Sequence, residues 1–398
     1  MAMIDDLLKE LCPDGVDYVK IQEVCVRQKG MNITAQRMCE LDNPNGQIKI
    51  FAAGSTVAMF NEADVPSQCI IRNPSIIVKS RGNIGFEYCI VPFSHKNEMW
   101  SYSAIDNKID LKYLFHLLLS KTDLFQFIAR SNAVKLPQLC VKDTDCYEIP
   151  LPPLPIQQHI VEVLDTFTDA ISNLEEELAL REKQCEYYRE QLLSFDDQNV
   201  KWSSIKDCIS SLSTGVNPRQ HFVLNSEGSS YNYITGKNIS NNKIDISSGA
   251  DKVNAQALSL INKRAKLAND MLLFASTGTG TVGRMAYVEH YDNSWTVSET
   301  LYVIKAKQLV NTKFLMHVLN AWHIKKQYIG KISKGSVPHL KMSDLLNVFI
   351  PVPSLERQQE IVEILDTFEA MIANIREEIV LRTKQYEYYR EKLLSFGN

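Results

Sequence analysis

The chain contains a long internal repeat, and this repeat limits the possible folds more than any other feature of the sequence. Residues 149–195 align without a gap on residues 350–396, and about 30 of roughly 47 positions are identical. The correspondence extends upstream, because residues 131–139 resemble residues 333–340. The repeated unit therefore includes the end of the segment before it. We expect two related halves with pseudo-twofold symmetry.

Each copy of the repeat has the pattern of a long helix. Apolar residues recur at alternating steps of three and four along 164–195 and 365–396, which is a heptad pattern. Neither run contains proline or glycine, whereas the proline-rich leaders at 150–155 and 351–353 block helix formation before each run. A helix of about 39 residues is roughly 58 Å long.

An apolar seam of this length needs a partner in water, and the nearest partner is the other copy in the same chain. A generic dimerising coiled coil is the alternative, but the repeat also extends into the globular segments. The N-terminal segment 4–11 is amphipathic, with Leu7, Leu8 and Leu11 on one side. We expect this segment to pack at the end of the helix pair.

The segments that precede the two helices have the pattern of mixed α/β domains. Short strands with turns, for example within 68–79 and 271–276, come before helical stretches at 111–130 and 312–328. Between these landmarks the two sequences diverge. A shared scaffold with different surfaces is what two modules for different targets would show. The expected fold class is therefore α+β, with two mixed α/β domains and two long helices.

Charge is distributed unevenly along the chain. The net charge is −4, yet residues 198–355 carry roughly +9 while residues 157–197 carry roughly −8. A basic segment of this size favours a nucleic acid partner. The alternative is a coiled-coil scaffold without DNA affinity, in which the basic excess is accidental. A salt-dependent shift of DNA by that fragment would exclude the scaffold.

The sequence offers little for catalysis, metal binding or export. The N-terminus lacks a basic region followed by an apolar run, and no stretch of about 18 apolar residues occurs, so a cytoplasmic protein without a membrane partner is expected. Nine cysteines without a C-x-x-C pair favour reduced thiols over disulfides or zinc. No metal-spaced histidine pair, Walker loop or nucleophile elbow appears, so we expect no catalytic residue and no metal site.

The order of these segments resembles a known family over nearly the whole chain. Two divergent domains, each followed by a proline-rich leader, a Gln-Gln-x-Ile-Val-Glu helix start at 157–162 and 358–363, and a heptad helix, look like the specificity subunit of type I restriction-modification systems. The expected parts are a first target-recognition domain at 1–150, a first helical spacer at 151–197, a second target-recognition domain at 198–349 and a second spacer at 350–398.

The resemblance implies a function. Each domain would read one half of a split, asymmetric site in double-stranded DNA, and the paired antiparallel helices would set the gap between the halves. The helices would also dock two methyltransferase (modification) subunits, which carry S-adenosylmethionine and methylate adenine, and restriction subunits would join through those. The chain itself would then have no catalytic centre and no cofactor.

Glycine-rich loops in both domains are the first candidates for DNA contact. Residues 278–283 match the pattern G-x-G-x-x-G, but a dinucleotide or methyl-donor site would need a helix after the loop, and residues 284–288 have the pattern of a strand. A hairpin tip close to DNA is preferred, with a structural turn as the alternative. The corresponding loop of the first domain is 79–85. Arginine can bond guanine bidentately, and asparagine can bond adenine. The candidate residues are Lys79, Ser80, Arg81, Asn83, Ser276, Thr277, Thr279, Thr281 and Arg284.

A second pair of loops, at 131–136 and 333–339, lies just before each helix leader. Small polar residues with lysine suit contact with phosphates and base edges, and a structural turn is again the alternative. The candidate residues are Ser131, Asn132, Lys135, Ser333, Lys334, Ser336 and His339.

A combined DNA methyltransferase that uses the loop Gly278–Gly283 is the rival function. The signature of adenine methylation, (Asp/Asn/Ser)-Pro-Pro-aromatic, is absent, because Asn73-Pro74-Ser75-Ile76 lacks the second proline and the aromatic residue. Binding of a methyl donor to the isolated chain would distinguish the two functions, and we expect none.

Overall fold

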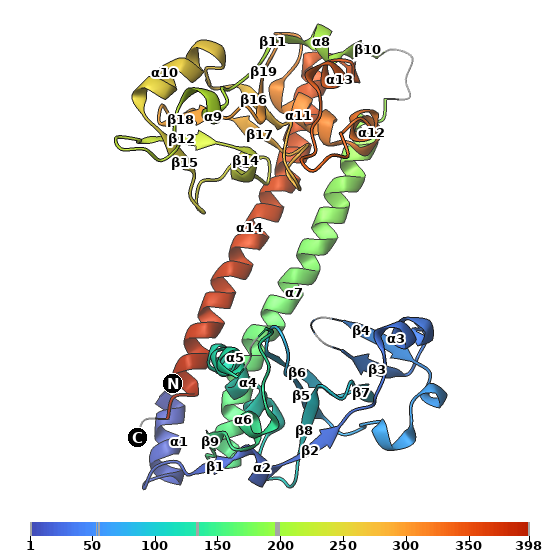
Figure 1. Ribbon diagram of the computed structural model, residues 1–398, viewed down its shortest axis with the longest axis vertical. Helices are drawn as coiled ribbons and strands as arrows, with labels where there is room; N and C mark the ends of the chain where they lie inside the picture. The colour runs from blue at the N-terminus through green and yellow to red at the C-terminus, as the bar shows by residue number, and fades with distance from the viewer. Residues whose placement is uncertain (1, 53, 55, 133–134, 196–199, 397–398) are drawn as a thin grey trace. The chain divides into compact units, whose positions relative to one another are not determined.

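The computed structural model describes residues 2–52, 54, 56–132, 135–195 and 200–396. Its contacts divide the chain into two compact units: residues 1–175 together with 377–398, and residues 176–376. Each unit therefore contains one globular domain and part of both long helices, α7 (Leu154–Leu193) and α14 (Leu355–Leu393). Figure 1 shows both helices as continuous ribbons.

The first unit contains three sheets and a set of short helices. The strands β2, β8, β5 and β6 form a four-stranded antiparallel sheet, β4, β3 and β7 form a three-stranded sheet in which β3 and β7 are parallel, and β1 pairs with β9. The elements are α1 (Ala2–Leu11), β1 (Tyr18–Lys20), α2 (Ile21–Val24), β2 (Cys25–Lys29), α3 (Ala35–Leu41), β3 (Ile48–Phe51), β4 (Val57–Phe60), the 3-10 helices Glu62–Asp64 and Ser67–Cys69, β5 (Ser75–Lys79), β6 (Gly85–Cys89), β7 (Phe93–His95), β8 (Trp100–Ala104), α4 (Leu111–Ser120), α5 (Thr122–Ser131), α6 (Val141–Asp145) and β9 (Glu148–Pro150).

The second unit repeats this plan. The strands β11, β19, β16 and β17 form the four-stranded sheet, β15, β12 and β18 the three-stranded sheet with β12 and β18 parallel, and β10 pairs with β20. A small hairpin of β13 and β14 is added. The elements are β10 (Lys201–Ser204), α8 (Ile205–Cys208), β11 (Ile209–Thr214), α9 (Pro218–His221), β12 (Tyr231–Ile234), the 3-10 helix Gly236–Asn238, β13 (Ile239–Ser240), β14 (Lys243–Ile244), β15 (Asp251–Val253), α10 (Ala255–Arg264), β16 (Met271–Ala275), β17 (Met285–Val288), β18 (Trp295–Val297), β19 (Leu301–Ala306), α11 (Thr312–Asn320), α12 (Trp322–Ile329), α13 (Met342–Leu346) and β20 (Phe349–Val352).

The predicted elements agree with the structure in type more than in extent. The strand expected at 271–276 is β16, whereas only the last part of 68–79 is a strand, β5. Each helical stretch is two helices, because the chain leaves helical geometry at Lys121 (φ −108°, ψ 9°) and Ala321 (φ −63°, ψ 133°). The first helix of each pair has a side-chain N-cap, Asp110 or Asn311, whose carboxylate or amide oxygen accepts from backbone N–H groups.

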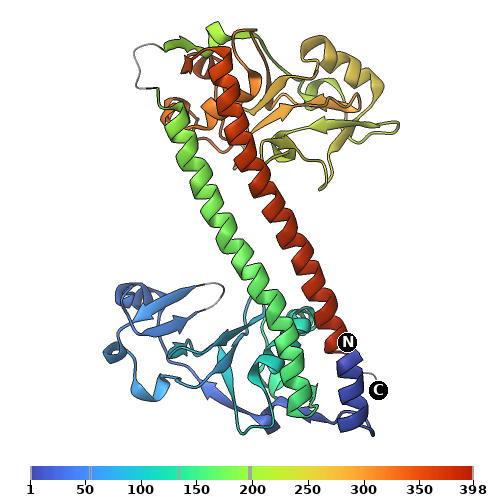
Figure 2. The ribbon, with the colours of Figure 1, turned by 180° about the vertical axis from the view of Figure 1, so that it is seen from behind.

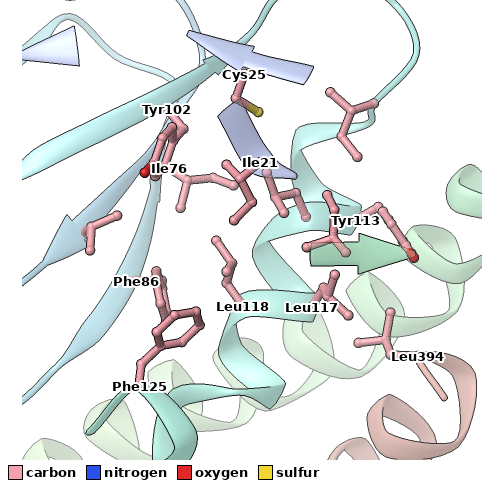
Figure 3. Packing of buried hydrophobic residues seen from close by; sticks show 14 of the residues in the cluster. Ile21, Cys25, Ile76, Phe86, Tyr102, Tyr113, Leu117, Leu118, Phe125 and Leu394 are labelled. Atoms are coloured by element: carbon pink, nitrogen blue, oxygen red, sulfur yellow. The ribbon is translucent and has the colours of Figure 1, made fainter. Parts of the chain in front are cut away.

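In each unit one hydrophobic core lies between the four-stranded sheet and the helices. Figure 3 shows Ile76 and Phe86 of the sheet facing Leu117 and Leu118 of α4, with Leu394, the residue just after α14, nearby. The second core combines the corresponding sheet and α11 with the start of α14. The long helices are therefore part of both hydrophobic cores.

The two long helices run antiparallel within each unit. Phe167 stacks on Tyr389 in the first unit and Tyr188 on Phe368 in the second, each with ring centroids 5.2 Å apart. In the second unit Arg189 pairs with Glu369, while Glu182, one heptad earlier, pairs with a later residue of α14, Arg376. The predicted intramolecular pairing of the heptad helices is confirmed, and each helix is continuous in the two views (Figures 1 and 2).

The N-terminal helix α1 lies beside the end of α14 in both views (Figures 1 and 2). Leu7 and Leu8 pack against the core cluster that contains Leu393 and Leu394, as the amphipathic pattern predicts, while Leu11 is 40% exposed.

A repeated glutamine anchors each globular domain to its helix. The Gln157 side chain is fully buried; its amide oxygen accepts from Asp110 N (2.8 Å), and its amide nitrogen donates to the carbonyls of Lys108 (2.9 Å) and Pro152 (2.7 Å). Gln358 makes the three equivalent bonds in the second unit. The first glutamine of the Gln-Gln-x-Ile motif is thus explained by the backbone groups that its side chain satisfies.

A second repeated contact uses charge. Asp165 of α7 accepts from Lys112 and from His116 Nε2 (3.0 Å) of α4. The same arrangement recurs in the second unit among Asp366, Lys313 and His317. Burial alone would raise the pKa of the Asp165 carboxyl, but the hydrogen bonds from Lys112 and His116 outweigh burial and lower that pKa.

We expect Asp165→Asn to destabilise the first unit. Loss of the charged hydrogen bonds should lower the free energy of unfolding by about 1–3 kcal/mol at pH 7. Because the folded pKa is lowered, the stabilisation is present above the unfolded value of about 3.9 and is lost as the pH falls through the folded value. Urea denaturation should therefore show a difference from wild type that shrinks below about pH 4. The control is Asp169→Asn, an exposed aspartate one helical turn away, which should unfold like wild type.

Candidate nucleic-acid interface

The two loops predicted separately in the first domain are joined by backbone hydrogen bonds. Gly82 N donates to Pro137 O, and Leu139 N donates to Ser80 O, both at 2.8 Å. We call residues 79–85 and 131–138 the first loop pair; residues 133 and 134 lie outside the described part. The loop between β5 and β6 therefore lies beside the segment that leads to α6.

The second domain joins its loops in the same way. Gly278 N donates to Pro338 O (3.0 Å), and Leu340 N donates to Ser276 O (2.8 Å). Residues 276–284 and 333–339 are the second loop pair. Gly82 and Gly278 take φ values of +79° and +126°, which side chains rarely adopt, so the equivalent turn needs glycine in both domains.

Three of the candidate hydroxyl groups support the loops from within. Ser80, Ser276 and Thr281 are at most 9% exposed. Ser80 donates to Glu98 O, and Ser276 donates to Thr300 O at 2.9 Å. Thr281 donates to Thr277 O at 3.3 Å. These side chains satisfy backbone carbonyls inside the domains.

Other candidates already have partners within their own domain. Lys79 pairs with Glu87 at 2.7 Å, and Arg284 Nη1 donates to Ile239 O at 3.2 Å. The remaining partnered candidates are Ser131 with Phe127 O, Asn132 with Asp143, Thr277 with His339 Nδ1, and Ser333 with His339 N. A DNA contact by these groups would replace or share an existing bond.

Six candidates are exposed and make no side-chain hydrogen bond or ion pair with any residue that the structure describes. They are Arg81, Asn83, Lys135, Thr279, Lys334 and Ser336. All six come from the two loop pairs, so each domain presents uncommitted donors on adjacent backbone segments. Lys326 and Lys331, both exposed, add positive charge close in sequence to the second loop pair.

Two glutamines that the sequence analysis did not select also shape the first loop pair. Gln126 of α5 accepts from Ile84 N (2.9 Å) and donates to Gly82 O (3.2 Å). Gln138 is exposed and forms a β-bridge with Arg81. No local pattern marks either residue, because their partners are distant in sequence.

The glycine-rich loop 278–283 lies between two strands. The strand that the sequence predicts at 284–288 is β17 (Met285–Val288), which pairs antiparallel with β16. A phosphate-binding loop of the dinucleotide type places its glycines at the start of a helix, whose N-terminus holds the anion. In this chain the same glycines form a hairpin connection.

The described residues include no helix with the length and apolar character required to cross a membrane.

Residues 13–181 and 199–381 each match the family model described as the type I restriction modification DNA specificity domain. The specificity subunit of the Escherichia coli type I restriction enzyme EcoR124I/EcoR124II is 30% identical over 311 residues, covering 74% of this chain and 73% of that protein. A putative type I specificity subunit of Mycoplasma pneumoniae is 26% identical over 388 residues, covering 95% of this chain and 97% of that protein.

A solved structure shares the fold. The crystal structure of a type I restriction-modification system S subunit from M. genitalium matches with a TM-score of 0.63 at 16% identity, covering 96% of this chain and 97% of that chain. The two family matches cover both halves of the internal repeat, as the resemblance predicted. The chain therefore belongs to the type I restriction-modification specificity subunits, the non-catalytic DNA-recognition proteins of these systems.

Proposed function

We propose that the chain reads a split, asymmetric site in double-stranded DNA, with one loop pair for each half of the site. One observation carries this proposal: the backbone bonds that join the loops are equivalent in the two domains, whereas the exposed side chains on them differ. Equivalent scaffolds support a similar approach to DNA, and different side chains support different half-sites.

The side chains of the two loop pairs suit different chemical tasks. Arg81 and Asn83 of the first pair are exposed and can make bidentate bonds to guanine and adenine in the major groove. In the second pair, Lys334 suits a phosphate, while the hydroxyl groups of Thr279 and Ser336 can bond phosphates or base edges. Arg284 can reach a base only if it shares or releases its bond to a backbone carbonyl. Because DNA is the proposed target, we also propose a cytoplasmic location.

Replacement of the loop arginines tests this assignment. We expect Arg81→Ala to weaken specific DNA binding by about 1–3 kcal/mol and to relax one position of the recognised motif, because a bidentate guanine contact is lost. Arg284→Ala should relax a position in the other half, with a smaller loss of affinity. Binding of randomised DNA sites followed by sequencing measures both effects.

The control for this experiment is Arg37→Ala, which removes an exposed arginine of the first domain outside the loop pairs. This variant should keep the motif and the affinity. If both loop variants also keep them, these loops are not the reading surface.

We further propose that the spacer helices dock two methyltransferase (modification) subunits, which would bring S-adenosylmethionine, and that restriction subunits join through those. Apolar side chains are exposed at equivalent positions of the two copies: Leu180 and Leu381 are 65% and 50% exposed, and Tyr187 and Tyr388 are 60% and 58% exposed. Large apolar side chains on a helix surface are typical of partner contacts. Two equivalent patches support two copies of one partner.

Introduction of a negative charge into this apolar surface should remove the modification subunits one at a time. We expect Leu381→Glu alone to reduce the modification subunits bound per chain from two to one, and Leu180→Glu with Leu381→Glu to leave none. Mass measurement of the complex in solution gives the stoichiometry. Glu186→Gln, which changes an exposed charged residue of α7, is the control. Two subunits bound to the double variant would contradict this docking surface.

A further inference from the structure

Each unit contains a buried histidine that binds an aspartate of a long helix. His116 Nε2 bonds Asp165 Oδ1, and His317 Nε2 bonds Asp366 Oδ1, both at 3.0 Å. Both histidines are at most 2% exposed. The two pairs occupy equivalent positions of the internal repeat, so the surroundings of the other ring nitrogen can be compared directly.

The other ring nitrogen is satisfied only in the first unit. His116 Nδ1 bonds the hydroxyl of Tyr386 at 3.0 Å. The alignment of the two helices places Cys185 where Tyr386 stands, and a cysteine side chain lacks the length and the hydroxyl of tyrosine. His317 Nδ1 is buried and has no hydrogen-bond partner among the described residues.

A carboxylate faces this nitrogen in place of the hydroxyl. Glu369 Oε1 lies 3.6 Å from His317 Nδ1, while the equivalent position of α7 is Thr168. If the Nε2 proton is donated to Asp366, the neutral imidazole has a lone pair on Nδ1. Two acceptor atoms then lie 3.6 Å apart, and either a proton or a metal ion between them would remove their repulsion.

We propose that His317 and Glu369 bind a divalent metal ion such as Zn²⁺, with Asp366 orienting the imidazole. Zinc bonds of about 2.0–2.1 Å to nitrogen and 2.0–2.2 Å to oxygen, at a tetrahedral angle, separate the two ligand atoms by roughly 3.4 Å. The observed 3.6 Å is close to that value, and it is longer than the usual hydrogen bond of about 2.7–3.2 Å. A carboxylate that accepts from the second nitrogen of a ligating histidine is the common arrangement at metal sites.

A cavity adjoins the two carboxylates of this site, and further ligands would come from it. A cavity of about 940 Å³ is lined by Glu369, Asp366 and Cys185 together with other residues of α7, α14 and the second domain. Burial raises the pKa of the Cys185 thiol, and Cys185 does not belong to the cluster of His317, Asp366 and Glu369. Water in the cavity would complete the coordination.

Neighbouring cations limit the expected affinity. Arg189 donates to Glu369 at 3.2 Å and Lys313 to Asp366 at 2.9 Å, and Asn242 also donates to Glu369 at 2.8 Å. A metal ion must share Glu369 with Arg189 and Asn242. We therefore expect micromolar affinity rather than the tighter binding of a dedicated zinc site. Because His317 belongs to α11 and Glu369 to α14, the ion would link the second domain to its helix.

Metal titration of the purified, chelator-treated full chain tests the proposal. We expect one equivalent of Zn²⁺ or Co²⁺ to bind and to raise the unfolding temperature of the wild type. Glu369→Gln should lower the affinity at least about tenfold, because loss of even an outer-shell partner of a metal site typically costs about 10- to 100-fold. Glu186→Gln removes another acid that lines the same cavity but is not part of the cluster of His317, Asp366 and Glu369, and it should bind like wild type.

A second variant gives the second unit the tyrosine that the first unit has at the equivalent position. Cys185→Tyr should supply the hydroxyl that His317 lacks and abolish binding of the one metal ion per chain. The chain should stay folded, because the first unit already accommodates tyrosine at this position. Conversely, Thr168→Glu with Tyr386→Cys should create a second metal site, in the first unit, so that the chain binds two metal ions. If the wild type binds no more Zn²⁺ or Co²⁺ than Glu369→Gln, a proton fills the gap and the proposal is wrong. If Cys185→Tyr fails to fold, the Glu369→Gln comparison decides.

Discussion

Exchange of residues 198–349 for the matching segment of another family member should change one half of the recognised DNA motif and leave the other half unchanged. The reason is that the second loop pair lies entirely within this segment, whereas the first loop pair belongs to the other compact unit. Each domain also has its own core, so a new second domain does not disturb the first. Motif sequencing of DNA modified by the assembled complex measures the result.

The junctions of this exchange are structurally suitable. The second core receives Ile361, Val362 and Leu365 from the start of α14, and the first core receives Ile160, Val161 and Leu164 at the equivalent positions of α7. The same helix surface therefore accepts two different domains in this chain. The ladder of β10 with β20 (Phe349–Val352) crosses the downstream junction, but it is held by backbone bonds that do not depend on side chains.

Reinsertion of the original segment 198–349 into the exchanged chain is the control, and it should restore the original motif. Loss of both half-sites in a chimera that folds and assembles would show that the two domains do not read independently.

The sequence predicts the long helices well because their signals are local. The heptad steps and the proline leaders need only the neighbouring residues, and the identity of the two copies predicts a shared plan. The sequence does not predict that the two loops of each pair are joined. Residue type marks both loops of each pair as candidates for DNA contact, yet nothing local indicates that Gly82 donates to Pro137 or Gly278 to Pro338.

The parts that sequence reasoning did not find depend on distant contacts. The metal candidate joins His317 to residues about 50 positions away, at a spacing that no short motif describes. The hairpin of β13 and β14 has no counterpart in the described part of the first unit. Its turn residues Asn241 and Asn242 both adopt positive φ and bond Arg376 and Glu369 of α14. Asparagine tolerates this backbone, but its side-chain partner can be identified only in three dimensions.

Insertion of one heptad into each long helix should abolish binding to the native DNA site. The matched positions lie midway between the stacked aromatic pairs, between Glu177 and Leu178 in α7 and between Glu378 and Ile379 in α14. Seven residues preserve the apolar seam and lengthen each helix by about 10 Å, which corresponds to roughly 3 base pairs. The insertions separate the ion pairs Glu177–Arg181 and Glu378–Arg382, but they leave the two hydrophobic cores unchanged, so both domains should remain folded.

Lengthening the DNA gap should rescue this variant weakly at best. Addition of about 3 base pairs also rotates one half-site by roughly 100° around the DNA axis, because a helical turn takes about 10 to 10.5 base pairs. One heptad rotates the paired helices far less, since a left-handed coiled coil drifts by only about 20° per heptad. A rigid helix pair cannot match both the distance and the rotation. Binding to sites with gaps extended by one to eleven base pairs measures this, and each isolated half-site serves as the control for folding. Undiminished binding to the original gap would show that the helices do not set the spacing between the half-sites.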